Sequence, residues 1–310
     1  MLSSIPKHDR IPFGNQTHNM LHTLLYFLAL LSLSTSANLA KWSHMPSQTL
    51  GFWRLGIAAA LLAVWVFAVK RTPIPRITKN FGWVLLSGFF FFLHLWTFKY
   101  AAKNTSISHT MIIFSSNPVW ASLGAVAFFN EKLSSRLVFS YILALLGVFV
   151  LVSKDINLGQ SINYGDWSSL VSAMLFALYM LTGKKARHHY DNNFFSLVQY
   201  SVCALLFGLG VLATGVTFTG YDEVSWLAVI GLVLIPTFLG HFTFTYLVKY
   251  FELGLLTCGK LIEPVFASIL AFYMFGETLT YHTAIAFLLT AVSLLVLFFP
   301  VLKRGLEGNR

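Results

Sequence analysis

The stretch NPVWASLGAVAFFNEKL (117–133) returns 146 residues later as EPVFASILAFYMFGETL (263–279). Without a gap, eight of the 16 positions from 118 to 133 meet an identical residue, far above the chance level for apolar sequence. A second pair, TFKYAAK (97–103) and TFTYLVK (243–249), keeps the same offset. The chain therefore contains two copies of one unit.

The composition indicates a membrane protein. The chain has 310 residues, of which 56% are hydrophobic and 10% are charged, whereas a soluble domain usually has about 25% charged residues. So little polar material cannot cover a globular surface, so we expect a lipid bilayer as the main partner. The net charge of +10 does not indicate nucleic acid, because all basic residues except Arg54, Lys99 and Lys260 fall in predicted tails and short loops.

Ten apolar runs approach the length of about 20 residues that a spanning helix needs. They predict an all-α membrane protein with ten transmembrane helices, at residues 20–39, 49–69, 81–100, 106–129, 136–152, 165–183, 194–214, 225–247, 253–275 and 281–302. The first run is interpreted as a retained helix because no small-residue cleavage site follows it. We expect a tail at 1–19, five-helix repeats at 20–152 and 164–302, and a tail at 303–310.

The distribution of basic residues predicts the orientation. With the N-terminus inside, the inside segments hold 15 Lys and Arg residues and the outside loops hold three. Because basic loops stay on the cytoplasmic side, this bias predicts that both termini are cytoplasmic in a bacterial inner membrane. The inside residues are Lys7, Arg10, Lys70, Arg71, Arg76, Lys79, Lys132, Arg136, Lys184, Lys185, Arg187, Lys249, Lys303, Arg304 and Arg310, and the outside residues are Lys41, Lys103 and Lys154.

Five helices per copy make the copies enter the membrane in opposite directions. The charges agree: the loop 70–79 has four basic residues, whereas its counterpart at 216–225 has none and carries Asp222 and Glu223. Inverted repeats of this kind are typical of secondary transporters, which bind their substrate near the bilayer midplane between the repeats. The pattern therefore predicts a small-molecule transporter.

The repeated stretches, together with FWRLGIAAA (52–60), resemble the EamA branch of the drug/metabolite transporter superfamily, over about residues 20–302. The resemblance implies a ten-helix bundle with a central cavity. It also implies that the helices at 136–152 and 281–302 lie at the periphery. Members of the family include exporters of amino acids and related metabolites, drug-efflux proteins and a few importers. The resemblance specifies the class of protein but not its substrate.

A Glu–Pro pair interrupts the run at 253–275. Pro264 has no N–H, so the carbonyl of Lys260 loses its helical partner, and Pro118 does the same to Phe114. Freed carbonyls at membrane depth can serve as ligands where they line a cavity. Lys260 and Glu263 are three residues apart and share one helix face. We predict that this face lines the cavity and binds substrate; the alternative is that the two residues neutralise each other as a structural pair.

Other candidates follow from the repeat and from polar residues at depth. Asn117 is the counterpart of Glu263, and Pro118, Pro264 and Gly240 are predicted hinges. Arg54 has a fork that suits a carboxylate or phosphate, but it could instead snorkel to the outer interface or pair with a carboxylate there. Glu131 and Glu277 are interpreted as helix-end groups. The remaining substrate-binding candidates are Trp53, His94, Trp96, Tyr179, His241 and Tyr246.

Catalytic signatures are missing from the sequence. It contains no nucleophile elbow, P-loop, HExxH motif or paired-carboxylate arrangement, and its two cysteines have no zinc spacing. We therefore predict that the protein is not an enzyme and uses no cofactor or metal. The oligomeric state stays open, with a homodimer as one option.

The favoured function is export of a small polar or amphiphilic metabolite, an amino acid or a derivative, by alternating access. Uptake of a larger metabolite such as S-adenosylmethionine and drug efflux are the alternatives within transport. A membrane scaffold is the alternative outside it. The sequence leaves the coupling ion open between a proton, sodium and none.

Overall fold

The computed structural model describes residues 16–130, 134–157, 163–251, 253–278 and 280–307, and every regular element within them is a helix. In this part of the chain, seven helices are long and apolar enough to cross a membrane. They are Leu21–Trp42, Ser47–Val69, Phe81–Asn104, Ile107–Phe129, Asn192–Thr214, Glu223–Leu247 and Leu256–Phe275. The protein is therefore an all-helical, multi-pass membrane protein.

The described residues of the first half form seven α-helices and one π-helical turn. In chain order they are α1 (Gln16–Ser34), α2 (Ser36–Trp42), α3 (Ser47–Ala63), η1 (Val64–Val69), α4 (Phe81–Asn104), α5 (Ile107–Phe114), α6 (Asn117–Phe129) and α7 (Ser135–Asn157). The short elements join end to end, so that α1 continues into α2, α3 into η1, and α5 into α6.

The second half follows the same plan. Its elements are α8 (Tyr164–Arg187), α9 (Asn192–Thr214), α10 (Glu223–Leu232), η2 (Val233–Phe242), α11 (Thr243–Leu247), α12 (Leu253–Cys258), η3 (Gly259–Ile262), α13 (Glu263–Phe275) and α14 (Tyr281–Glu307). Helix α13 begins and ends 146 residues after α6, and α14 begins 146 residues after α7. Left-handed residues end both α6 and α13, namely Asn130 (φ 52°) and Gly276 (φ 65°). The repeat in the sequence is thus a repeat in the structure.

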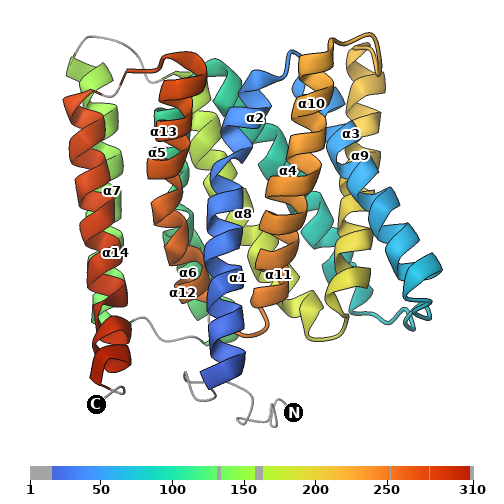
Figure 1. The fold of residues 1–310 in the computed structure, drawn as a ribbon, viewed down its shortest axis with the longest axis horizontal. Coiled ribbons are helices and arrows are strands. Elements are labelled where there is room, and N and C mark those ends of the chain that lie inside the picture. The colour runs from blue at the N-terminus through green and yellow to red at the C-terminus, as the bar shows by residue number, and fades with distance from the viewer. Residues whose placement is uncertain (1–15, 131–133, 158–162, 252, 279, 308–310) are drawn as a thin grey trace.

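Equivalent helices of the two halves run in opposite directions (Figure 1): α1 rises from the end that carries the termini, whereas α8 descends toward it. Helices α7 and α14 pack against each other at one edge of the bundle, where the resemblance placed them. The end that holds the start of α1 also holds the loops after η1 and after α8. The basic residues of 70–79 and those in the last turn of α8, Lys184, Lys185 and Arg187, lie at or beside these loops.

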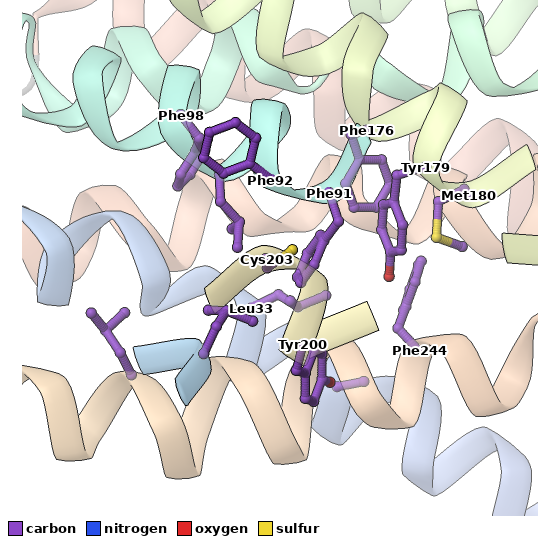
Figure 2. Close-up of a cluster of buried hydrophobic side chains, with 14 of the residues drawn as sticks. Leu33, Phe91, Phe92, Phe98, Phe176, Tyr179, Met180, Tyr200, Cys203 and Phe244 are labelled. Carbon is purple, nitrogen blue, oxygen red and sulfur yellow. The ribbon is translucent and has the colours of Figure 1, made fainter. Parts of the chain in front are cut away.

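The core lies where helices of the two halves meet. Helix α4 packs against α8 and α9, α3 packs against α9, and α1 packs against η2. Aromatic side chains fill the space between these helices, among them Phe91, Phe176 and Phe244 (Figure 2). Large apolar side chains such as Phe128 and Leu212 are exposed on the outside of the bundle, as expected for helices that face lipid.

Candidate functional site

Both helices that contain the repeated Pro are broken just before it. Helix α5 ends at Phe114, a turn at 115–116 follows, and α6 begins at Asn117. In the second half, α12 tightens into the 3₁₀ turn η3 before α13 begins at Glu263. The two broken helices pack against each other, since α5 contacts α13 and α6 contacts α12. The breaks therefore come together inside the bundle.

The carbonyls that the prolines release each accept a hydrogen bond, so the expectation that they lack a donor is wrong. Asn117 donates from Nδ2 to the carbonyl of Phe114 at 2.8 Å. The carbonyl of Lys260 accepts the N–H of Glu263 through the 3₁₀ turn. Because both carbonyls already accept a hydrogen bond, the polar groups at the breaks that still lack a partner are on side chains.

A small central cavity lies beside the second break. Its volume is about 10 Å³, close to the minimum that holds one water molecule. A metabolite therefore requires a wider cavity than this compact conformation offers. The cavity is lined by Leu33, Ser36, His94, Leu95, Phe98, Phe114, Phe176, His241, Lys260 and Glu263.

Lys260 and Glu263 form an ion pair, with 2.5 Å between Nζ and Oε1, and their side chains are only 2% and 3% exposed. The ammonium group also lies over three aromatic rings, at 4.7 Å from the centroid of Phe176, 5.4 Å from Phe114 and 5.5 Å from Phe244. Cation–π contacts and a carboxylate together stabilise a charge that would otherwise be costly at this depth. The pair is thus both mutually neutralising and cavity-lining.

Two buried histidines face the same cavity, with ring centroids 6.2 Å apart. His94 Nδ1 lies 2.8 Å from Ser172 Oγ, and Ser172 Oγ donates to the carbonyl of His94. Because the hydroxyl proton is used there, this geometry favours a proton on Nδ1 of His94, which donates to Ser172 Oγ. His241 Nδ1, by contrast, has no hydrogen-bond partner in the described part of the chain.

Arg54 reaches the cavity wall from α3. Its guanidinium is fully buried, and it donates from Nε to Thr237 Oγ1 at 2.7 Å and from Nη1 to the cavity-lining Ser36 at 3.5 Å. The π-helical segment η2 positions this acceptor: Pro236 cannot donate to the carbonyl of Leu232, and Thr237 Oγ1 donates to it at 2.7 Å. Arg54 therefore neither snorkels nor pairs with a described carboxylate.

Tyr179 and Asn117 lie in the layer around the cavity. The Tyr179 ring packs 4.8 Å from Phe91 and 6.2 Å from His241, and its hydroxyl is buried without a partner among the described residues. Asn117 Oδ1 is likewise unpartnered there. Both residues can contact a substrate only if the centre opens.

Three predicted site residues lie elsewhere. Trp53 donates from Nε1 to the carbonyl of Phe218, in the loop between α9 and α10. Trp96 packs against the ring of Phe207, on the α9 side of α4. The Tyr246 hydroxyl lies 3.3 Å from Nε2 of His22, near the start of α1. The structure does not bring these three side chains to the central cavity.

The predicted hinges occupy different settings. Pro118 and Pro264 stand directly after the breaks, as the second residues of α6 and α13. Gly240 lies in η2, where an added Cβ would come within 2.9 Å of Leu33, so close approach of α1 explains that glycine. Glu277 ties helix ends together by binding Lys41 at 2.6 Å and the N–H of Ile107. Glu131 lies outside the described residues.

Several residues of this region escaped the sequence reasoning, including the cavity-lining Ser36 and Phe176 and the Arg54 partner Thr237. Hydroxyl and phenyl side chains are frequent in apolar helices, so their identity alone gave no signal. For Thr237, the preceding proline was a usable signal, because a hydroxyl beside a proline can replace the missing donor. Within the residues that the structure describes, no group of three His, Cys, Asp or Glu could hold a metal.

The fold and the site define a multi-pass membrane protein with a polar centre at the junction of two repeated halves. A family model for EamA-like transporters matches residues 20–153 and 163–299, so the chain belongs to the EamA-like transporter family. It is a membrane transporter.

Similar proteins agree with this assignment. An uncharacterized transporter of Archaeoglobus fulgidus is 25% identical over 76% of this chain and 82% of its own length. An uncharacterized transporter of Clostridium kluyveri is 23% identical over 79% of this chain and 81% of its own. A solved crystal structure superposes with a TM-score of 0.72 at 19% identity, covering 93% of this chain and 99% of its own, and shows a shared fold.

Proposed function

We propose that the protein is a secondary transporter that exports a small polar or amphiphilic metabolite, an amino acid or a derivative, by alternating access. One observation carries this proposal: a buried site with charged and imidazole groups lies where the broken helices of both halves meet. Charged groups inside a membrane are costly and typically mark a substrate path. Secondary transporters place such sites at the interface between repeats.

The proposal includes a topology. Ten helical segments cross a bacterial inner membrane as two inverted five-helix repeats, residues 20–152 and 164–302. The end of the bundle that holds the start of α1 and the basic loops is cytoplasmic. Its support is the position of those loops at one end.

The deciding experiment is a metabolite profile by mass spectrometry of medium and cytosol. Cells that overproduce the intact protein are compared with cells that overproduce Lys260→Ala/Glu263→Ala at equal membrane abundance. A compound enriched outside and depleted inside only with the intact protein would identify the substrate and establish export. Enrichment inside would instead establish uptake, and the same profile from both proteins would exclude the Lys260–Glu263 pair as the site.

A further inference from the structure

Among the described residues, the guanidinium of Arg54 has no counter-ion. It is fully buried, and no carboxylate of the described residues lies within 4.0 Å of it. Its Nη2 atom is buried and has no hydrogen-bond partner in the same part of the chain. Glu263 cannot supply the missing charge, because Lys260 occupies its carboxylate. A guanidinium offers five N–H donors in a planar fork. In Arg54, the donors on Nη2 are not used by any described residue.

Two more unpartnered polar atoms lie at or beside the cavity lining. His241 Nδ1 and Tyr179 Oη are both buried without a partner in the described residues. Their rings lie 6.2 Å apart, and the hydroxyl end of Tyr179 points away from its own helix toward the side that holds Tyr200 (Figure 2). Tyr200 in turn donates to the carbonyl of Thr237, the residue whose hydroxyl binds Arg54.

All three groups, the Arg54 guanidinium, the Tyr179 hydroxyl and the His241 imidazole, can donate a hydrogen bond. A guanidinium only donates, a tyrosine hydroxyl donates one hydrogen, and a neutral imidazole can donate from Nδ1. Buried donors are costly when unsatisfied. An anionic acceptor with two oxygens satisfies all of them, and a carboxylate matches the planar guanidinium fork. The neighbouring wall is apolar and aromatic, with Phe98, Phe114 and Phe176.

We propose that the transported molecule carries a carboxylate that binds Arg54 with help from His241 and Tyr179, while its apolar part packs on the phenylalanine wall. An amino group is tolerated but not required, since Glu263, the one carboxylate among the described residues that line the cavity, is already paired. This inference rests on the proposed transport function and narrows its substrate class to organic carboxylates.

The test uses four probes with one carbon skeleton: 3-phenylpropanoate (anion), phenylalanine (zwitterion), phenylalaninamide (cation) and 3-phenylpropanamide (neutral). The thermal midpoint of the purified full-length protein in detergent is measured with each probe over a concentration series. Ligands that bind only the folded protein raise this midpoint. We expect the two carboxylates to raise it by several degrees and the two amides to leave it unchanged. Equal shifts from all four probes, or no shift from either carboxylate, would overturn the proposal.

Variants separate recognition by Arg54 from a purely structural role. Arg54→Met should abolish the preference for carboxylate over amide, and Arg54→Lys should retain part of it. Lys99→Met is the matched control. Lys99 is an equally buried cation, but it packs 4.2 Å from the centroid of Phe207 and donates to the carbonyl of Ser47, away from the cavity lining. This control should keep the full preference.

The outcomes remain informative if Arg54→Met does not fold, because the four probes test the intact protein. A folded Arg54→Met with unchanged carboxylate preference would refute the assignment to Arg54. Carboxylate binding without any change in the metabolite profile would support the site and refute transport. A profile that identifies a substrate without a carboxylate would support transport and refute this inference.

Discussion

At the scale of single residues, each proline at a helix break stands beside the group that compensates for it. The side chain of Asn117 donates to the carbonyl that Pro118 leaves open, that of Phe114. At the second break, the N–H of the residue before Pro264 donates to the carbonyl of Lys260. Buried carbonyls without donors are costly, so these substitutes let the helices break at depth without losing hydrogen bonds.

The Lys260–Glu263 pair should show strong energetic coupling. Lys260→Ala and Glu263→Ala each leave a buried charge unpaired, which should lower the free energy of unfolding by roughly 3–5 kcal/mol. The double variant should lose much less than the sum of the two. The measurement is a double-mutant cycle by detergent-induced unfolding of the purified protein.

The matched control is Lys41→Ala. It breaks the Lys41–Glu277 pair, whose side chains are 27% and 14% exposed, and should cost only about 0–1 kcal/mol. Additive losses for Lys260 and Glu263 would contradict a coupled pair.

Gly259 is required by the close approach of Tyr26. A Cβ at this position would overlap the Tyr26 hydroxyl, which donates to the carbonyl of Leu256 at 3.0 Å. Gly259→Ala should therefore lower the free energy of unfolding by about 1–3 kcal/mol, the usual cost of overpacking. Gly56→Ala is the control, because its new Cβ would lie 3.9 Å from Ala204. Equal stability of the two variants, measured by thermal unfolding, would disprove the steric explanation.

At the scale of elements, the π-helical turn η2 holds Arg54 in place. Thr237 has two functions there: its hydroxyl donates to the carbonyl of Leu232 and accepts from Nε of Arg54. Wider helical turns of this type occur frequently at functional sites. The turn thus links the backbone break at Pro236 to the position of a buried charge.

Thr237→Val should destabilise the protein although it preserves the shape of the side chain. It removes the acceptor for a charged donor and the donor to a buried carbonyl, which should cost about 1–3 kcal/mol in the free energy of unfolding. Thr237→Ser keeps the hydroxyl and should lose clearly less. Chemical or thermal unfolding of both variants decides between them, and an equal loss would show that the methyl group matters more than the hydroxyl.

The start of α10 should respond to acid. Asp222 caps this helix, and hydrogen bonds from Ser225 and from His44 lower the pKa of its carboxyl. A lowered pKa in the folded protein contributes stability above the ordinary value of about 3.9, and this contribution is lost as the pH falls below that value. The thermal midpoint of the natural protein should therefore drop more between pH 5 and pH 3 than that of Asp222→Asn. An equal drop would exclude Asp222 as the titrating group.

At the scale of the whole molecule, the sequence predicted the architecture better than the site. The offset of 146 residues between the two copies and the lengths of the apolar runs are read from long stretches of sequence, so single residues hardly affect them. The site depends on which face of a helix points inward, and helices that are apolar all round carry little information about that face. Thus His94 lines the cavity, whereas Trp96, two residues further along the same helix, packs on another face.

Charge alone identified buried polar groups, but not their partners. Arg54, Lys260 and Glu263 were conspicuous in the sequence because ionised groups are rare at membrane depth. The partner of Arg54, Thr237, comes from a helix 183 residues away in the chain. Such tertiary contacts could not be deduced without the packing of α3 against η2.

The orientation can be tested by cysteine labelling. The native Cys203 and Cys258 are fully buried, so they should give little background. In intact cells, a membrane-impermeant maleimide should label Thr219→Cys in the loop before α10. It should label Lys79→Cys, in the basic loop before α4, only after permeabilisation. The reverse labelling pattern would show that the orientation is opposite to the proposed one.

Under the proposed alternating-access mechanism, the unequal residues at the two helix breaks would give the molecule a bias between its conformations. Phe114 and Asn117 stand where the second half has Lys260 and Glu263, so the charge pair belongs to one half alone. Identical halves would interconvert between inward-facing and outward-facing forms of equal free energy, because exchanging their roles would regenerate the same molecule. In this chain, exchanging the roles of the two halves moves the Lys260–Glu263 ion pair into a different environment. Under the proposed mechanism, the empty carrier would therefore rest on a preferred side even without a gradient, and a single substitution at either break should shift that preference.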